Sequence, residues 1–256
     1  MLDPEKTKHE YDSIAAVYNN HYGPSPTASL EHELIGIALG DLTGRTVLDL
    51  GGGSGLHARH AVELGAVAVD IIDVSPGMLK VAADIEKAAG RGGVMRFFAA
   101  DAAKPLSHLP LREGGYDVVM ANWVFDFAET VEVLEAMFRN AVRYLKTGGL
   151  FVGVRIANPY STVLKTGQHG LTFTSMQPIP GGVKYREVIL SDPPIESDAA
   201  SLEVLYSGSP AVYEEAGLTG VEIIPYTAGS VVDNDPWYWA DFLKDPFFAV
   251  VKALKK

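Results

Sequence analysis

Hydrophobic residues repeat with two different periods along the 256-residue chain, and these periods predict alternating strands and helices. Continuous apolar runs predict strands at residues 46–50, 67–73, 94–100, 116–121 and 150–156. Between them, apolar positions three or four residues apart predict helices at about 56–64, 76–89 and 129–146. Because continuous apolar strands suit a parallel sheet covered on both faces, this order predicts a doubly wound α/β fold.

The segments on either side of this core predict further elements. A helix over residues 5–20 would carry Tyr11, Ile14, Ala15 and Tyr18 on one face. A second helix is predicted at 28–40. Towards the end of the chain we expect a short helix at 210–216, strands at 221–226 and 246–254, and a loop or short helix at 233–239.

The alternation of strands and helices stops at residues 158–208, which are rich in Gly, Pro, Ser and Thr. Two pieces of this segment, 184–190 and 202–206, resemble strands. Long segments without regular structure are uncommon unless they are functional, so we interpret 158–208 as a lid inserted above the sheet. We therefore expect one domain with four parts: an N-terminal helical cap (1–44), a cofactor-binding core (45–157), a substrate lid (158–208) and the C-terminal part of the sheet (209–256).

The overall charge changes the expected partners. The formal net charge is −11, and the only dense basic run is Lys252–Lys256, so we expect no nucleic-acid partner. No apolar run approaches the roughly 20 residues that span a bilayer, and residues 1–6 lack the apolar stretch of a signal peptide. The chain has no cysteine, which excludes thiol chemistry. We expect a cytoplasmic protein with a small-molecule substrate and no membrane partner; the oligomeric state stays open.

A glycine-rich turn at 51–55 joins the strand at 46–50 to the helix at 56–64. Glycines at such a junction allow a nucleotide-like cofactor to approach the backbone closely. No phosphate-binding G-x-x-x-x-G-K-[ST] sequence follows a strand. Residues 53–58 match the dinucleotide pattern G-x-G-x-x-A but begin two residues late, and the carboxylate of Asp49 would repel a pyrophosphate. That carboxylate suits the cationic sulfonium and ammonium groups of S-adenosyl-L-methionine.

Polar residues also follow the next three predicted strands. Asp73 is placed to accept hydrogen bonds from ribose hydroxyls, and Asp101 from an adenine amino group. The backbone carbonyl group at Asn122 is placed to meet the cofactor ammonium, and the Trp123 indole to flank the methyl-transfer region. Because strand ends of an open α/β sheet converge on one crevice, these residues predict a single cofactor site.

Five segments together resemble the successive motifs of class I S-adenosylmethionine-dependent methyltransferases: VLDLGGGSG, IIDVSPGML, FFAADAAKPL, YDVVMANWVF and LKTGGLFVGVRI, over about residues 45–156. YDSIAAVYNNHY also resembles the N-terminal helix of small-molecule members, whose tyrosines close over the cofactor. The resemblance implies a mostly parallel seven-stranded sheet with a reversed last hairpin. Together with the strand-end positions, it implies cofactor contacts at Tyr11, Tyr18, Asp49, Gly51, Gly53, Asp73, Val74, Met78, Asp101, Ala102, Asn122 and Trp123.

The chain departs from the family pattern at three positions. Gly52 stands where Cys, Thr or Ser is common, and Asn19 replaces an acid that often follows the second tyrosine. Ile71 stands where a glycine often precedes the ribose-binding acid, which would crowd the strand.

We therefore expect methyl transfer to a small, ring-containing metabolite. A cyclase that uses the cofactor without methylation and a cofactor-binding regulatory protein are the alternatives. His21, Tyr22, His169, Tyr185 and Glu187 are candidate bases or orienting groups, with His169 and Tyr22 as the catalytic candidates. Tyr22, Arg155 and His169 are the candidate substrate contacts. His57 and His60 lack a third ligand and are interpreted as surface residues, so no metal site is expected.

Overall fold

A computed structural model describes residues 4–22 and 25–256, without the side chains of residues 4, 16 and 19–22. The first half contains α1 (Pro4–Tyr22), α2 (Pro26–Leu39), β1 (Thr46–Leu50), α3 (Leu56–Glu63), β2 (Ala68–Asp73), α4 (Pro76–Ala88), β3 (Met95–Ala99), β4 (Tyr116–Met120), the 3-10 helix η1 (Val124–Phe127) and α5 (Val131–Tyr144). The second half contains β5 (Leu145–Ile156), α6 (Thr162–Thr166), β6 (Leu171–Ile179), β7 (Gly182–Ile189), β8 (Ile195–Leu202), α7 (Glu203–Tyr206), α8 (Ala211–Glu215), β9 (Leu218–Ile223), α9 (Val231–Asn234), α10 (Pro236–Lys244) and β10 (Phe248–Lys255).

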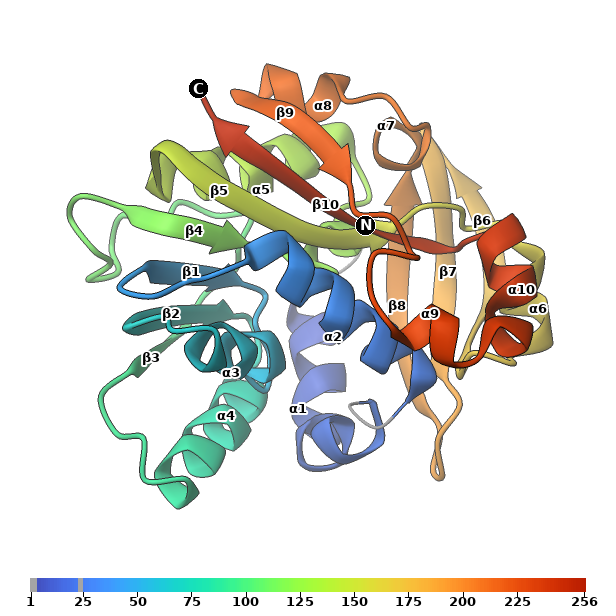
Figure 1. Cartoon of the computed structure of the whole chain (residues 1–256), viewed down its shortest axis with the longest axis horizontal. Helices are drawn as coiled ribbons and strands as arrows, with labels where there is room; N and C mark the ends of the chain where they lie inside the picture. Colours follow the sequence, from blue (N-terminus) through green and yellow to red (C-terminus); the bar gives the residue numbers. More distant parts are fainter. Residues whose placement is uncertain (1–3, 23–24) are drawn as a thin grey trace.

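The larger sheet has seven strands in the order β3-β2-β1-β4-β5-β10-β9 (Figure 1). Strands β1 to β5 are parallel, whereas β10 runs antiparallel to both β5 and β9. The predicted doubly wound, mostly parallel sheet with a reversed last hairpin is confirmed. In β1 the residues Val47, Leu48 and Leu50 are fully buried, as expected of a strand with helices on both faces.

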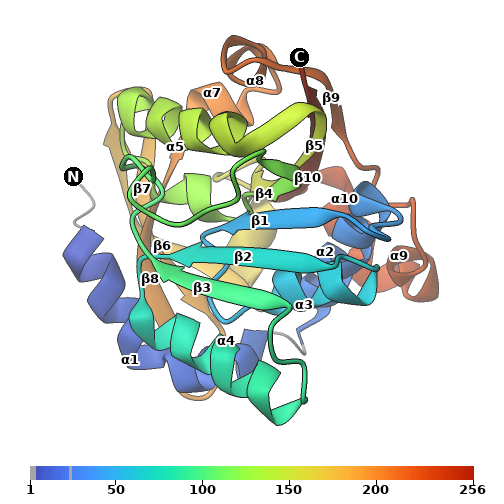
Figure 2. The same ribbon diagram turned by 90° about the vertical axis from the view of Figure 1, so that its left-hand side faces the viewer.

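The two faces of this sheet build two separate hydrophobic cores. Val47 belongs to one core with side chains from α2 and α3, while Leu48 belongs to the other with side chains from α5 and α8. Figure 2 shows α5 on one side of the sheet and α3 and α4 on the other. Alternate residues of each strand therefore serve opposite layers, and the carboxyl ends of the strands stay clear for a ligand.

Residues 158–208 contain a second sheet of three antiparallel strands, β6-β7-β8. The predicted strand at 184–190 corresponds to β7, but the predicted strand at 202–206 is wrong: β8 ends at Leu202 and residues 203–206 form α7. The strand β6 was not predicted, because its Thr, Ser and Gln residues are largely exposed and make no apolar run. Tertiary pairing with β7 stabilises it instead.

Three other predicted boundaries also change. The helix predicted at 129–146 ends at Tyr144, and β5 starts at Leu145 rather than at residue 150. Residues 233–239 belong to two short helices, α9 and the start of α10. In the described parts of the chain, no helix has both the length and the apolar character that crossing a membrane requires.

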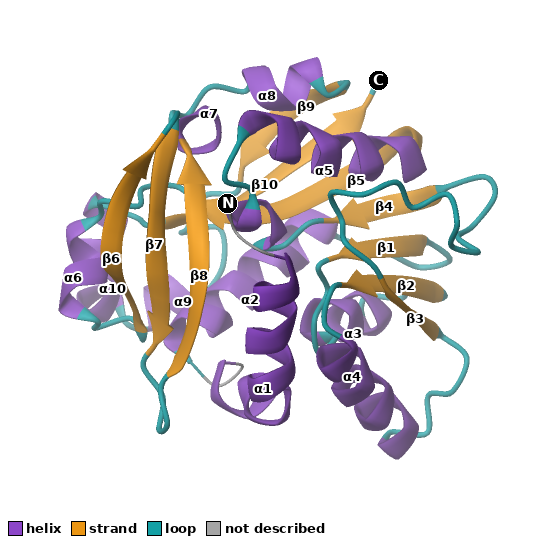
Figure 3. Ribbon diagram, turned by 180° about the vertical axis from the view of Figure 1, so that it is seen from behind, coloured by secondary structure: helices purple, strands orange, loops and turns teal. Residues whose placement is uncertain are grey.

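Helix α1 lies between the two sheets and next to α4 (Figure 3). On one side, Glu10 binds Arg186 of β7 with a 2.6 Å contact between its Oε1 and the arginine Nη1. On the other side, Asp12 accepts hydrogen bonds from Ser75 and Gly77 at the start of α4. The helix is thus held above the carboxyl ends of β1 and β2, with Tyr11 and Tyr18 facing the space between the layers.

Candidate functional site

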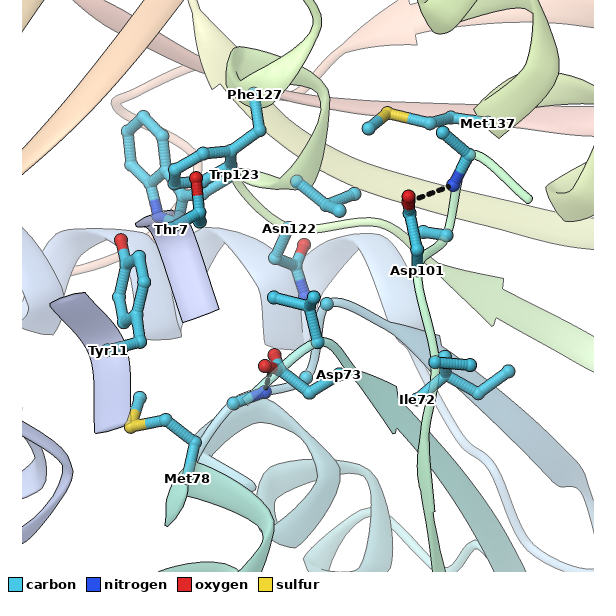
Figure 4. A pocket seen from close by; sticks show the side chains of 18 of the residues that line it. Thr7, Tyr11, Ile72, Asp73, Met78, Asp101, Asn122, Trp123, Phe127 and Met137 are labelled. Carbon is cyan, nitrogen blue, oxygen red and sulfur yellow. Dashed lines mark hydrogen bonds between the residues drawn. The ribbon is translucent and has the colours of Figure 1, made fainter. Parts of the chain in front are cut away.

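A pocket of about 290 Å³ lies at the carboxyl ends of β1 to β4 (Figure 4). Helix α1, the glycine-rich turn, η1 and α5 supply the rest of its wall. The predicted cofactor residues that line it are Tyr11, Tyr18, Gly51, Gly53, Asp73, Val74, Met78, Asp101, Ala102, Asn122 and Trp123. Asp49 lies in β1 directly before the turn and is completely buried. The fold therefore brings residues from five separate segments to one cavity.

The glycine-rich turn needs glycine for steric reasons. Gly51 and Gly53 have φ angles of 70° and 53°, in the left-handed region that other residues rarely adopt. A Cβ atom at Gly51 would lie 2.7 Å from Cβ of Val124. The amide of Gly53 donates a 2.8 Å hydrogen bond to Oδ2 of Asp73, so the end of β2 also holds the turn in place.

Gly52 and Ile71, both unusual for the family pattern, fit together because the missing side chain at position 52 leaves room for the bulky one at position 71. A Cβ atom at Gly52 would lie 2.8 Å from Cγ2 of Ile71 and 2.6 Å from Oδ2 of Asp49. Ile71 is completely buried and pairs with Asp49 across β1 and β2. Its side chain fills the space under the turn that a Ser, Thr or Cys at position 52 would need. Ile71 therefore does not line the pocket. Its side chain crowds the glycine-rich turn and not the space for a ligand.

Asp49 is the most unusual charged group at the site. Its side chain is fully buried, and neither carboxylate oxygen accepts a hydrogen bond from any described residue. Burial raises its pKa to about 7, and nearby His57 opposes that rise. Both polar atoms of the buried Asn122 amide likewise have no partner within the described chain. Buried groups without partners are costly unless a ligand satisfies them, and a cationic amino-acid group would fit this pair.

Asp73 and Asp101 shape the neighbouring turns. Asp73 accepts 2.8 Å hydrogen bonds from the amides of Gly53 and Ser75, and burial raises its pKa to about 6. Asp101 accepts a 2.8 Å hydrogen bond from the amide of Ala103 (Figure 4). A carboxylate has about four lone-pair sites, so both groups keep acceptor capacity for ligand hydroxyl or amino groups.

An aromatic wall closes the side of the pocket opposite the acids. The ring centroid of Tyr11 lies 6.1 Å from that of Tyr18 and 5.8 Å from that of Phe127, and both pairs pack edge to face. Trp123 has a φ of 62°, which is uncommon for a bulky residue, and its buried indole N–H finds no acceptor in the described chain. Such strain is retained only where the surrounding structure imposes it, as at ligand sites.

His57 is a pocket residue that the sequence interpretation missed. Its Nε2 lies 2.9 Å from Oε1 of Glu31 on α2. Burial by itself would lower the pKa of His57, but the hydrogen bond and charge of Glu31 outweigh this effect, so the pKa is raised overall. The interpretation of His57 and His60 as surface residues is wrong, because α2 packs over α3 and covers both. No local pattern in the sequence reveals that packing.

The predicted substrate residues lie elsewhere. His169 is buried against α10, stacked 4.9 Å from Trp239, and neither ring nitrogen has a partner in the described chain. Arg155 is buried in β5 and donates a 3.0 Å hydrogen bond to the carbonyl oxygen of Ile156. Neither residue lines the pocket. The side chains of His21 and Tyr22, and that of Asn19, lie outside the described part of the structure.

Metal ligands are not gathered at this site or elsewhere in the described chain. Within the described residues 4–22 and 25–256, no group of three or more His, Asp or Glu side chains has the arrangement of a metal site. His60 instead stacks on His32, with 3.6 Å between the ring centroids. Burial lowers the pKa of His60 to about 4.

Comparison with known proteins adds independent information. Residues 47–149 match the model of a family described as a methyltransferase domain. The CcbJ methyltransferase from Streptomyces caelestis has a similar structure, with 21% identity, a TM-score of 0.64 and coverage of 98% of both chains. The [4+2]-cyclase SpnF is 17% identical, with a TM-score of 0.62 over 98% of this chain and 96% of its own.

The N-methyltransferase NodS from Bradyrhizobium japonicum WM9, in complex with S-adenosyl-L-homocysteine, is 14% identical, with a TM-score of 0.58 over 98% of both chains. No curated protein sequence matches the chain significantly. At these identities the solved structures establish the shared fold, whereas the family match covers the turn, the three acids and Asn122. Residues 47–149 therefore match a methyltransferase domain, the chain shares the fold of solved S-adenosylmethionine-dependent methyltransferases, and the match indicates S-adenosyl-L-methionine as the cofactor.

Proposed function

We propose that this protein transfers a methyl group from S-adenosyl-L-methionine to a small, ring-containing metabolite. The observation that carries this proposal is the buried, unpartnered carboxylate of Asp49 beneath a pocket with an aromatic wall. A phosphate-containing cofactor would meet repulsion there, whereas a cationic one would supply the missing partner.

Within this proposal each strand end has one task. Asp49 and Asn122 bind the amino-acid end of the cofactor, Asp73 binds the ribose hydroxyls and Asp101 binds the adenine amino group. The bound cofactor supplies a methyl group on a sulfonium, which is a good leaving group. Trp123, Tyr11 and Phe127 then exclude water and hold the acceptor in line with that methyl group. Alignment of this kind can supply much of the rate acceleration without a dedicated base.

The aromatic wall supports a ring-containing acceptor. Tyr11, Tyr18, Trp123 and Phe127 offer flat apolar faces, and each is only partly buried where it meets the pocket. Flat aromatic side chains favour ring-shaped ligands through offset or edge-to-face packing. The cytoplasm as location, the absence of membrane and nucleic-acid partners, and the four-part domain organisation remain part of the same proposal.

Cyclisation without methyl transfer is the second candidate function. The observation that favours it is the structural likeness to the cyclase SpnF, which extends over 98% of this chain. Incubation with candidate acceptors and mass spectrometry separates the two. A methyltransferase yields S-adenosyl-L-homocysteine and a product heavier by a single methyl group, whereas a cyclase leaves the cofactor unchanged.

Calorimetric titration tests the premise that both functions share. S-adenosyl-L-methionine and S-adenosyl-L-homocysteine are expected to bind the protein, and NAD is not. Binding of NAD with no binding of either sulfur compound would overturn the proposed function.

A further inference from the structure

The inner face of the three-stranded sheet places Glu187 beside the aromatic wall of the pocket. In β7, Glu187 pairs with Phe173 of β6 and with Ser197 of β8. Oγ of Ser197 lies 3.5 Å from the Tyr11 hydroxyl, and Tyr11 lines the cofactor pocket. Glu187 therefore lies on the side of Tyr11 that faces the three-stranded sheet, while the carboxyl ends of β1 to β4 lie on the other side of Tyr11.

The charge on Glu187 is not neutralised by the described chain. No described residue forms a hydrogen bond or an ion pair with its carboxylate. The two cationic neighbours on β7 pair elsewhere: Lys184 binds Glu129, and Arg186 binds Glu10, Glu196 and Asp198. By contrast, the buried Glu86 has its own arginine, Arg91. A carboxylate with a purely structural role is normally paired in this way.

Glu187 lies next to the pocket, beyond Tyr11, and is not one of the residues that line it. The side chain is partly accessible to solvent. Burial nevertheless raises its pKa to about 7, and the neighbouring Glu31 raises it further. A partly accessible carboxylate of this kind can still be reached by a ligand, and a cation beside it would lower its pKa again.

The groups around Glu187 favour a cation. The carboxylate of Glu31 on α2 raises the pKa of Glu187. The charge of Glu187 in turn raises the pKa of four neighbouring groups, which are Asp126 on η1 and the hydroxyls of Tyr11, Tyr18 and Tyr185. Aromatic faces are also present, since Phe173 stacks on Tyr185 at 3.8 Å. Two bases of the neighbouring elements are already engaged, since His57 contacts Glu31 and Arg155 donates to a carbonyl group. Carboxylates and aromatic faces together attract an ammonium group.

We propose that Glu187 binds the ammonium group of the acceptor and removes its proton, so that the methylated atom is an amine nitrogen. This inference rests on the proposed function and names the acceptor class for the same site. The proton passes from the ammonium to the Glu187 carboxylate, which leaves a lone pair on nitrogen. That lone pair forms the new N–C bond while the S–C bond breaks towards sulfur, giving S-adenosyl-L-homocysteine and a methylated ammonium. Glu187 then releases its proton to solvent.

Tyramine, tyrosol and 4-hydroxyphenylacetate test this inference, because they share a ring and differ mainly in an amine, a hydroxyl and a carboxylate. Each is titrated calorimetrically into protein saturated with S-adenosyl-L-homocysteine, with benzylamine and tryptamine as further amines. The amines are expected to bind at least about tenfold more tightly than the alcohol and the acid. Glu187→Gln is expected to remove that preference, and Glu187→Asp to retain part of it.

Glu196→Gln is the matched control, because Glu196 lies on the outer face of the same small sheet and pairs with Arg186. It should keep the wild-type preference. No amine binding below about 10 mM, or equal binding of the alcohol, would overturn the inference. So would an unchanged preference in a folded Glu187→Gln protein. If S-adenosyl-L-homocysteine itself does not bind the wild type, the proposed function fails instead. The wild-type preference stands as evidence even where the glutamine variant does not fold.

Discussion

The Ser75 hydroxyl donates a 2.6 Å hydrogen bond to Oδ1 of Asp12. Ser75 is the N-cap of α4, and Asp12 lies on α1 next to Tyr11. The same Asp12 oxygen accepts a 2.8 Å hydrogen bond from the amide of Gly77. The helix that carries the two tyrosines is thus attached to the start of the helix that follows Asp73.

Asp12→Ala is therefore expected to weaken cofactor binding by about tenfold, since two hydrogen bonds to a charged group are lost. The thermal midpoint of the core should change little, because Asp12 is exposed. Calorimetry and limited proteolysis within residues 4–22 would measure the two effects. Ser13→Ala is the control, because the Ser13 hydroxyl contacts only the Glu10 carbonyl group. Equal affinity in both variants would contradict this account.

The complementarity of Gly52 and Ile71 predicts a coupled pair of substitutions. Gly52→Ser should destabilise the protein by about 1–3 kcal/mol, because its Cβ would press against Ile71 and Asp49. The same change in an Ile71→Ala background should cost at least about 0.5 kcal/mol less, because the clash with Ile71 is then relieved while that with Asp49 remains. Urea unfolding of the four proteins gives the coupling energy. Strictly additive effects would show that the two residues do not share this space.

The raised pKa values predict that stability without cofactor falls as pH rises. Burial raises the pKa of Asp49 from 3.8 to about 7 and that of Asp73 to about 6. A carboxyl group whose pKa is higher in the folded state binds protons more tightly there, so its contribution is complete below about pH 4 and is lost as pH rises through 6 to 7. Thermal unfolding between pH 5 and 8 should show this loss, and bound S-adenosyl-L-methionine should reduce it.

Asp49→Asn should separate stability from binding. Without an ionisable group at this position, the unliganded variant should be more stable than wild type at about pH 8, and its pH dependence should be smaller. It should also bind S-adenosyl-L-methionine at least about tenfold more weakly, because the partner of the ammonium group is lost. Asp41→Asn, which changes an exposed carboxylate on the loop before β1, is the control for the change in net charge. A variant that binds as tightly as wild type would refute the role of Asp49.

His169 offers a test of the catalytic candidate from the sequence. Its ring is buried between Tyr238, Trp239 and Phe242 and does not reach the pocket. His169→Phe should keep turnover within about twofold of wild type, and should not lower stability by more than about 1 kcal/mol, since an unsatisfied polar ring is replaced by an apolar one. Formation of S-adenosyl-L-homocysteine with an accepted substrate measures the first effect. A large loss of turnover with normal folding would restore His169 as a catalytic residue.

The fold and the residues that line the pocket could largely be predicted because their signals are local. Apolar runs such as 46–50 specify strands buried on both faces, and a glycine turn after such a strand has few other uses. Asp73, Asp101 and Asn122 each end or follow a predicted strand, and Asp49 is the penultimate residue of another. Since the carboxyl ends of parallel strands meet at one edge, their positions along the chain already imply one cavity.

The rest of the pocket surroundings was decided by tertiary structure, because it is built from contacts that no local pattern records. His57 became a pocket residue when α2 covered α3 and brought Glu31 to it. The strand β6 exists through its pairing with β7, and the pairing of β7 with β8 places Glu187 beside Ser197, which contacts Tyr11. Ile71 was compatible with the turn because position 52 has no side chain. Periodicity determines which face of an element is apolar, but only packing determines what that face meets.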